Sequence, residues 1–213
     1  MNSIREYGII PVSTDMVADS IGEYRSPADR ISLLTRRGDL IRLRRGLFVV
    51  APELSGQTLS RELIANHLFG PSYVSFESAL SYHGIIPERV HMVRSATFRR
   101  SRQMETPLGM FQYITVPENY YPVGIRQMLY EAENYSFLMA TPEKAICDLI
   151  ITTTGLRIQS VRAMREYLFE DMRMDFDDLE SIDTSIIEQC IEHGRRRREL
   201  RFLLNVLQNE QHV

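Results

Sequence analysis

The chain has 213 residues, of which 44% are hydrophobic and 25% charged, an ordinary composition for a globular protein of one large or two small domains. The net charge of −3 and the isoelectric point near 6.0 exclude a non-specific nucleic-acid coat protein, so any DNA contact must come from a local patch. No apolar run approaches the roughly 20 residues that span a bilayer. The first residues lack the apolar core of a secretion signal, and the distant Cys147 and Cys190 suggest no disulfide framework. We therefore expect a cytoplasmic protein.

The N-terminal residues predict a compact series of short elements. Residues 4–7 can form a brief helix that Gly8 closes, and residues 9–12 are extended. Ser13 or Thr14 then caps a second helix that runs to about residue 21. A unit of this size buries little core by itself, so we expect it to pack on the rest of the chain.

Residues 26–52 predict a capped helix followed by a tight hairpin. Ser26 can cap the helix, Pro27 suits its first position, and Gly38 can adopt the left-handed conformation that ends it. Residues 41–44 then alternate between apolar and arginine side chains, which is typical of a half-buried strand. Residues 45–46 make the turn, and residues 47–50 return as a second strand. This order of elements predicts a winged helix-turn-helix, with the hairpin as the wing.

The charges around this hairpin favour contact with duplex DNA, because arginine suits both phosphate oxygens and the edge of guanine. The alternative is an arginine rim that binds a protein partner. The candidate DNA-binding residues are Arg30, Ser32, Arg36, Arg37, Arg42, Arg44 and Arg45. We expect Ser32 and Arg36 to contact base edges, with Arg30 and Arg37 near phosphates. The three arginines of residues 42–45 would contact the backbone or the minor groove.

The rest of the chain predicts a larger domain. We place the domain boundary after residue 52, giving a DNA-binding domain of residues 1–52 and a second domain of residues 53–213. Its predicted strands are residues 90–98, 108–116, 124–130 and 135–139. Its predicted helices are residues 57–69, 75–83, 142–150, 158–169, 175–182, 185–193 and 195–207. We expect an α+β fold with a small, mainly antiparallel sheet flanked by helices.

Three motifs in this order resemble the AbiEi-like antitoxins of type IV toxin–antitoxin systems: LIRLRRGLFVVAP, YVSFESALSYHGI and ATPEKAICDLI. The likeness covers roughly residues 10–155. It departs at Phe48, where the family usually has tyrosine, and the final 50 residues match no signature.

The resemblance implies a repressor that binds inverted repeats in its own promoter and counteracts a nucleotidyltransferase-like toxin. It does not require a direct complex with that toxin. A second hypothesis is a ligand-responsive winged-helix regulator without a toxin partner.

The remaining chemical constellations do not indicate an enzyme. The segment from Thr141 to Asp148 could form a catalytic carboxylate–lysine set, but its spacing favours helix capping and a Lys144–Asp148 pair along one helix face. Cys190 and His193 lack a second pair of zinc ligands. We expect no catalytic activity, no metal and no cofactor. If the protein were a nuclease, it would cleave nucleic acid in a metal-dependent way, and the variant Glu143→Ala would lose this activity.

Two further basic groups could contact nucleic acid or a partner. The first consists of Arg94, Arg99, Arg100 and Arg102, around a predicted strand end and loop. Lys144, the only lysine among the 25 basic residues, is a separate candidate for such a contact. The second is the run at residues 195–198, which could instead pair with the acidic belt of residues 166–192.

Overall fold

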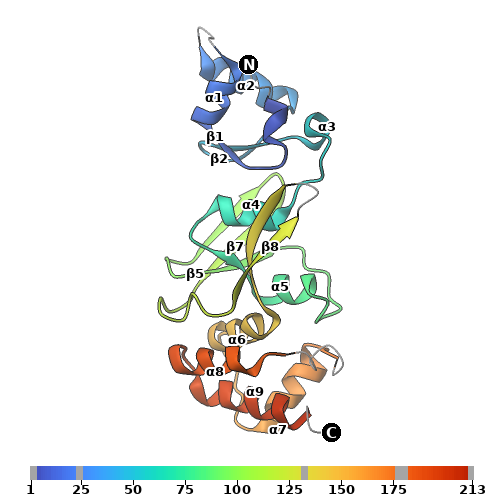
Figure 1. Cartoon of the computed structure of the whole chain (residues 1–213), viewed down its shortest axis with the longest axis vertical. Helices are drawn as coiled ribbons and strands as arrows, with labels where there is room; N and C mark the ends of the chain where they lie inside the picture. The colour runs from blue at the N-terminus through green and yellow to red at the C-terminus, as the bar shows by residue number, and fades with distance from the viewer. Residues whose placement is uncertain (1–3, 23–25, 131–133, 176–181, 211–213) are drawn as a thin grey trace.

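The structure is a computed structural model that describes residues 4–22, 26–130, 134–175 and 182–210. Its elements follow one another along a single long axis (Figure 1). A small helical and stranded unit forms the N-terminal end, a larger sheet forms the middle, and helices form the C-terminal end. The expected α+β class is confirmed. Within the described ranges, no helix is long and apolar enough to cross a membrane.

The N-terminal unit has the predicted order of elements. They are η1 (Ile4–Tyr7), β1 (Val12–Ser13), α1 (Thr14–Ile21), α2 (Pro27–Arg37), β2 (Leu40–Arg44) and β3 (Leu47–Val50). The three strands pair antiparallel in the order β1-β3-β2.

The ends of the N-terminal helices result from local chemistry. The Ser13 hydroxyl accepts a hydrogen bond from the backbone N–H of Met16 and caps α1. Ser26 likewise accepts from the N–H of Asp29 at the start of α2. Gly38 ends α2 at φ 82°, in the left-handed region that a Cβ disfavours. The capping predictions for α2 are confirmed.

The small sheet buries both of its faces. On one face, Leu40, Phe48 and Val50 pack with Ile31 and Leu34 of α2 in a local core. On the other face, residues 43, 47 and 49 join the main core of the molecule. All of β3 is therefore buried. The expectation that this unit packs on the rest of the chain is confirmed.

The middle of the molecule holds a six-stranded sheet in the order β6-β7-β5-β4-β9-β8. Its strands are β4 (Tyr73–Val74), β5 (Val93–Thr97), β6 (Arg102–Thr106), β7 (Gly109–Thr115), β8 (Ile125–Tyr130) and β9 (Tyr135–Ala140). The associated helices are α3 (Pro52–Ser55), α4 (Arg61–Leu68) and α5 (Phe76–Tyr82).

The sheet is mixed, although most of its strand pairs are antiparallel as predicted. β5 runs parallel to β7, and the short β4 runs parallel to β9. The other three pairs are antiparallel. β6 and β4 create this arrangement, and neither was predicted, because β6 is polar and β4 has only two residues.

Helix α4 connects the N-terminal unit to this sheet. Ser60 caps it by accepting from the N–H of Leu63, so it begins later than the predicted residue 57. The Tyr113 hydroxyl of β7 donates to the carbonyl of Ala65 at 2.7 Å. The Asn66 amide donates to the carbonyl of Leu138 on β9.

The C-terminal end consists of helices. They are α6 (Pro142–Thr152), α7 (Val161–Glu166), the π-helix η3 (Tyr167–Asp171), α8 (Thr184–His193) and α9 (Arg197–Glu210). Helix α6 is buried along almost its whole length and separates the sheet from the other helices (Figure 1). Most of the predicted helix at residues 175–182 lies outside the described residues.

Candidate nucleic-acid interface

A groove of about 420 Å³ lies between α2 and the β2–β3 turn at the N-terminal end of the molecule. From α2 it is lined by Ser32 and Arg36, and from the hairpin by Arg42 and Arg45. These four side chains are exposed. The structure thus brings together four of the residues that the sequence predicted for DNA binding.

One face of α2 provides the helical wall of this groove. Ala28, Ser32, Thr35 and Arg36 recur at intervals of three and four residues, so they lie on one side of the helix. Ile31 and Leu34 point into the local core on another side. Thr35 was not among the predicted residues, although its spacing from Ser32 and Ala28 places it on the same side of the helix.

A bulge sets the direction of the hairpin arginines. The register between β2 and β3 shifts from Arg42 opposite Phe48 to Arg44 opposite Leu47. Leu43 is thereby buried in the main core while both flanking arginines stay exposed. Bulges bend a strand and redirect its side chains, which accounts for the different settings of Arg42 and Arg44.

Arg44 contacts the second region. Its Nε donates to the carbonyl of Leu68, the last residue of α4, at 3.1 Å. Its charge is also close enough to Tyr113 to oppose, in part, the rise that burial causes in the pKa of that phenol. Arg44 therefore helps to hold the N-terminal unit against α4.

The two remaining candidates lie on α2 outside the groove lining. Arg37 is paired with Asp39 at 3.1 Å, while its side chain remains 60% exposed. Arg30 is half-buried. Arg37 is better placed than Arg30 to reach a phosphate. Its exposed guanidinium can leave the Asp39 carboxylate for a phosphate at little cost in free energy, because surface ion pairs are weak.

The basic group of Arg99, Arg100 and Arg102 lies next to the hairpin. Arg99, Arg100 and Arg102 are exposed, and within the described ranges none of them has an ion-pair partner. A hollow of about 380 Å³ lies between residues 100–102 and Phe69. Because Arg44 bonds to Leu68 and the Arg102 guanidinium lies 5.7 Å from the Phe69 ring, the two basic groups are neighbours.

Lys144 does not belong to this surface, and its predicted contact with a partner is corrected. The side chain is fully buried in α6, with Nζ 3.3 Å from Asp148 and 3.0 Å from the carbonyl oxygen of Tyr120. Nζ also lies 3.0 Å from the centre of the Tyr120 ring. No external partner can reach it. The predicted pairing with Asp148 and the cap by Thr141 are both confirmed.

Asp148 forms the centre of a buried polar cluster. Its second carboxylate oxygen accepts from the hydroxyls of Tyr73 at 3.0 Å and Ser75 at 2.6 Å. Burial, followed by the charge of Asp148, raises the pKa of Tyr73 well above its ordinary value. Ser75 precedes α5 but does not cap it with its side chain, because its hydroxyl is engaged by Asp148.

The other chemical candidates have structural roles. Glu143 is buried and accepts from the backbone N–H of Asp183. Among the described residues, no group of three or more potential ligands could hold a metal ion. Arginines of the C-terminal run bond to backbone carbonyls rather than to acidic side chains, with Arg196 donating to Ile150 and Arg198 to Gln159.

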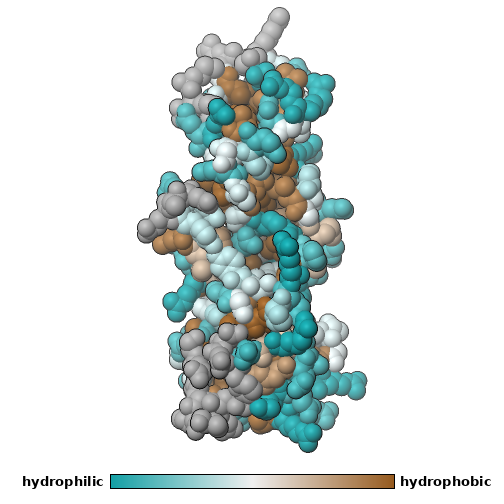
Figure 2. All heavy atoms as spheres, turned by 90° about the vertical axis from the view of Figure 1, so that its right-hand side faces the viewer, coloured by the Kyte–Doolittle hydropathy of each residue, from teal (hydrophilic) through white to brown (hydrophobic). Residues whose placement is uncertain are grey.

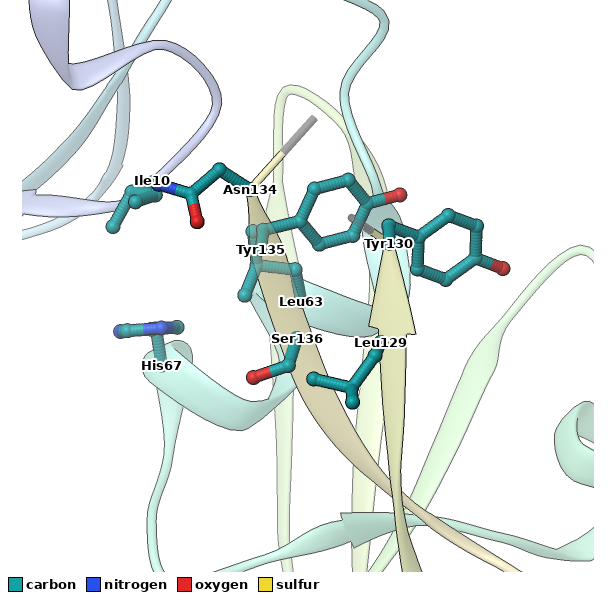
Figure 3. A pocket seen from close by; sticks show the side chains of 8 residues that line it. All are labelled: Ile10, Leu63, His67, Leu129, Tyr130, Asn134, Tyr135 and Ser136. Carbon is teal, nitrogen blue, oxygen red and sulfur yellow. The ribbon is translucent and has the colours of Figure 1, made fainter. Parts of the chain in front are cut away.

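A separate, uncharged hollow of about 390 Å³ lies where the N-terminal unit meets the β8–β9 hairpin (Figure 3). Ile10 comes from the N-terminal unit, His67 from the end of α4, and Leu129 and Ser136 from the hairpin. Leu129 is 66% exposed. Figure 2 shows hydrophobic residues at the surface between hydrophilic ones along one side of the molecule. The described residues that line it include no arginine or lysine to attract a phosphate.

No protein-family model matches the chain, and no curated protein matches it.

Proposed function

We propose that the N-terminal unit is a winged helix-turn-helix that binds duplex DNA, with α2 as the recognition helix and the β2–β3 hairpin as the wing. What supports this most is the groove in which exposed Ser32 and Arg36 of α2 face Arg42 and Arg45 of the hairpin. An α-helix fits the major groove, and a flanking arginine-rich hairpin can track the backbone or minor groove. The overall charge of −3 confines this attraction to the patch.

We further propose that the protein acts as an autoregulatory repressor and as the antitoxin of a type IV toxin–antitoxin system. The resemblance of its three motifs to AbiEi-like antitoxins supports this role. Its partners would be its own promoter and a nucleotidyltransferase-like toxin encoded beside it. Co-expression of the full-length protein with that toxin should restore growth, and growth arrest that persists would contradict the antitoxin role.

DNA binding is tested by the salt dependence of affinity for the promoter. The double variant Arg42→Ala/Arg45→Ala should weaken binding to all duplexes and reduce the slope of log affinity against log salt by about 1 to 2. A protein that makes fewer phosphate contacts releases fewer counterions when it binds. Fluorescence anisotropy on labelled promoter and random duplexes measures both quantities.

Arg44→Ala is the matched control for this experiment. It removes an arginine from the same hairpin, but one whose Nε donates to Leu68. We expect it to change the slope less than either Arg42→Ala or Arg45→Ala. An unchanged slope in the double variant would contradict the proposed role of the hairpin.

A ligand-responsive regulator is the second candidate function. A hollow of about 480 Å³ in the second region favours it, because a cavity of this size can hold a small molecule. The gene next to this one separates the two candidates, since only the antitoxin requires a neighbouring toxin.

A further inference from the structure

The 480 Å³ hollow lies far from the DNA-binding groove, between the central sheet and the C-terminal helices. Most of its surface is apolar and comes from Ile86, Val90 and Met92 in the connection between α5 and β5, and from Met172 at the end of η3. Polar and charged residues, among them His91 and Asp171, line the rest. Methionine side chains adapt their shape to a ligand more readily than branched ones. The volume is sufficient for a small aromatic or aliphatic molecule.

A fixed polar network borders the apolar walls. The Arg94 guanidinium is paired with the Glu77 carboxylate, and its Nε donates to Gln112 at 3.1 Å. Its central carbon lies 4.8 Å from the Phe76 ring. These contacts hold Arg94 in place and neutralise its charge, so it does not repel a cation in the hollow.

The carboxylates of this hollow are not all compensated. Glu88 is paired with Arg173, which lowers the pKa of Glu88 through their hydrogen bond. Asp171 also lines the hollow, and it has no cationic partner among the described residues. With Glu77 paired to Arg94, Glu88 paired to Arg173 and His91 of the lining counted as neutral, one negative charge remains at Asp171.

Tyr167 is close enough to the carboxylates of Glu77 and Asp171 for their charges to affect its pKa. Burial, followed by the carboxylates of Glu77 and Asp171, raises the pKa of Tyr167 to about 12. Its phenol is therefore protonated at neutral pH. A cation with an apolar body matches both the carboxylate of Asp171 and the apolar walls.

We propose that this hollow binds a small organic amine, with the ammonium group at Asp171 and the apolar body between Met92 and Met172. The charge complementarity of Asp171 and the apolar walls select a cationic amphiphile over an anion of the same shape. This inference does not rest on DNA binding.

The absence of tryptophan from the chain allows a direct test. Tryptamine carries an ammonium group on an indole ring, and its own fluorescence reports its binding to the full-length protein without DNA. Indole-3-propionate, the anionic counterpart, has the same ring. We expect saturable tryptamine binding that is about tenfold tighter than the binding of indole-3-propionate. The partly exposed carboxylate of Asp171 attracts the ammonium group of tryptamine and repels the carboxylate of indole-3-propionate.

Asp171→Asn should remove the preference for tryptamine and leave propionate binding unchanged or stronger. Glu170→Gln is the matched control, since Glu170 is the preceding exposed carboxylate and does not line the hollow. Unchanged thermal unfolding of both variants establishes that they are folded. The proposal is overturned if tryptamine does not saturate at millimolar concentration, if the two indoles bind equally, or if Glu170→Gln has the same effect as Asp171→Asn.

Discussion

Lys144 and Arg162 each pair with a carboxylate four residues further along a helix, but in opposite environments. The Lys144–Asp148 pair is fully buried, whereas the side chains of Arg162 and Glu166 are 88% and 58% exposed. Desolvation makes the buried pair costly to form and costly to break, because either partner alone would remain an uncompensated charge in the core. Water screens the exposed pair.

Lys144→Met should therefore destabilise the protein by about 3–5 kcal/mol, since the Asp148 charge remains buried without its cation. Urea unfolding followed by circular dichroism measures the loss. Arg162→Ala removes the same kind of pair from the surface and should have little effect. Comparable losses in the two variants would contradict the account of the buried cluster.

Arg36 lies in the last turn of α2, at the C-terminal end of the proposed recognition face, and its guanidinium has the fork of donors that can contact one base in a bidentate way. Arg36→Ala should cost about 1–3 kcal/mol of discrimination at one operator position. Binding to operators with single base changes measures it. Equal losses on operator and random duplex would instead assign Arg36 to the phosphate backbone.

At the scale of elements, the α2–hairpin segment formed as predicted because its signals are local. A capping serine, a proline at the first helical position and a glycine at the end act within a few residues of one another. β6 escaped prediction because its side chains are mostly exposed and it is stabilised by pairing with β7. Strands of this kind are defined by their neighbours.

Substitutions at Gly38 and Gly124 separate two costs of adding a side chain, which are an unfavourable backbone conformation and steric overlap with neighbouring atoms. Gly38 and Gly124 both have positive φ, but a Cβ on Gly38 would meet no atom within 4 Å, whereas one on Gly124 would lie 2.8 Å from Cβ of Lys144. Gly38→Ala should cost about 1–2 kcal/mol through backbone conformation alone. Gly124→Ala should cost more, because α6 must also move. Chemical unfolding of both variants would test this, and a larger loss in Gly38→Ala would be inconsistent with it.

At the scale of the whole molecule, the interface between the N-terminal unit and α4 determines whether the two regions unfold together. Ile9, Leu43, Leu47 and Val49 belong to the main core rather than to the local core of the N-terminal unit. The hydrogen bond from Arg44 to the carbonyl of Leu68 adds a polar contact across the same interface. The two regions therefore share apolar surface that neither could leave exposed without loss of stability.

We expect a fragment of residues 1–56 to lack a cooperative unfolding transition, because removal of the second region exposes these apolar side chains. The full chain should unfold in a single transition. Differential scanning calorimetry of both would show this. A fragment with its own sharp transition would establish an independent domain.

The sequence alone determined the caps of α2, the hairpin, the Lys144–Asp148 spacing and the groove residues of α2 and the turn. Periodicity and capping act between near neighbours along the chain, so such features can be predicted from short segments. Only the tertiary structure decided that Lys144 is buried, that Arg44 bonds to α4, and that Asp171 lines an apolar hollow. Burial and partners depend on segments that are distant in the chain, and no local pattern of residues specifies them.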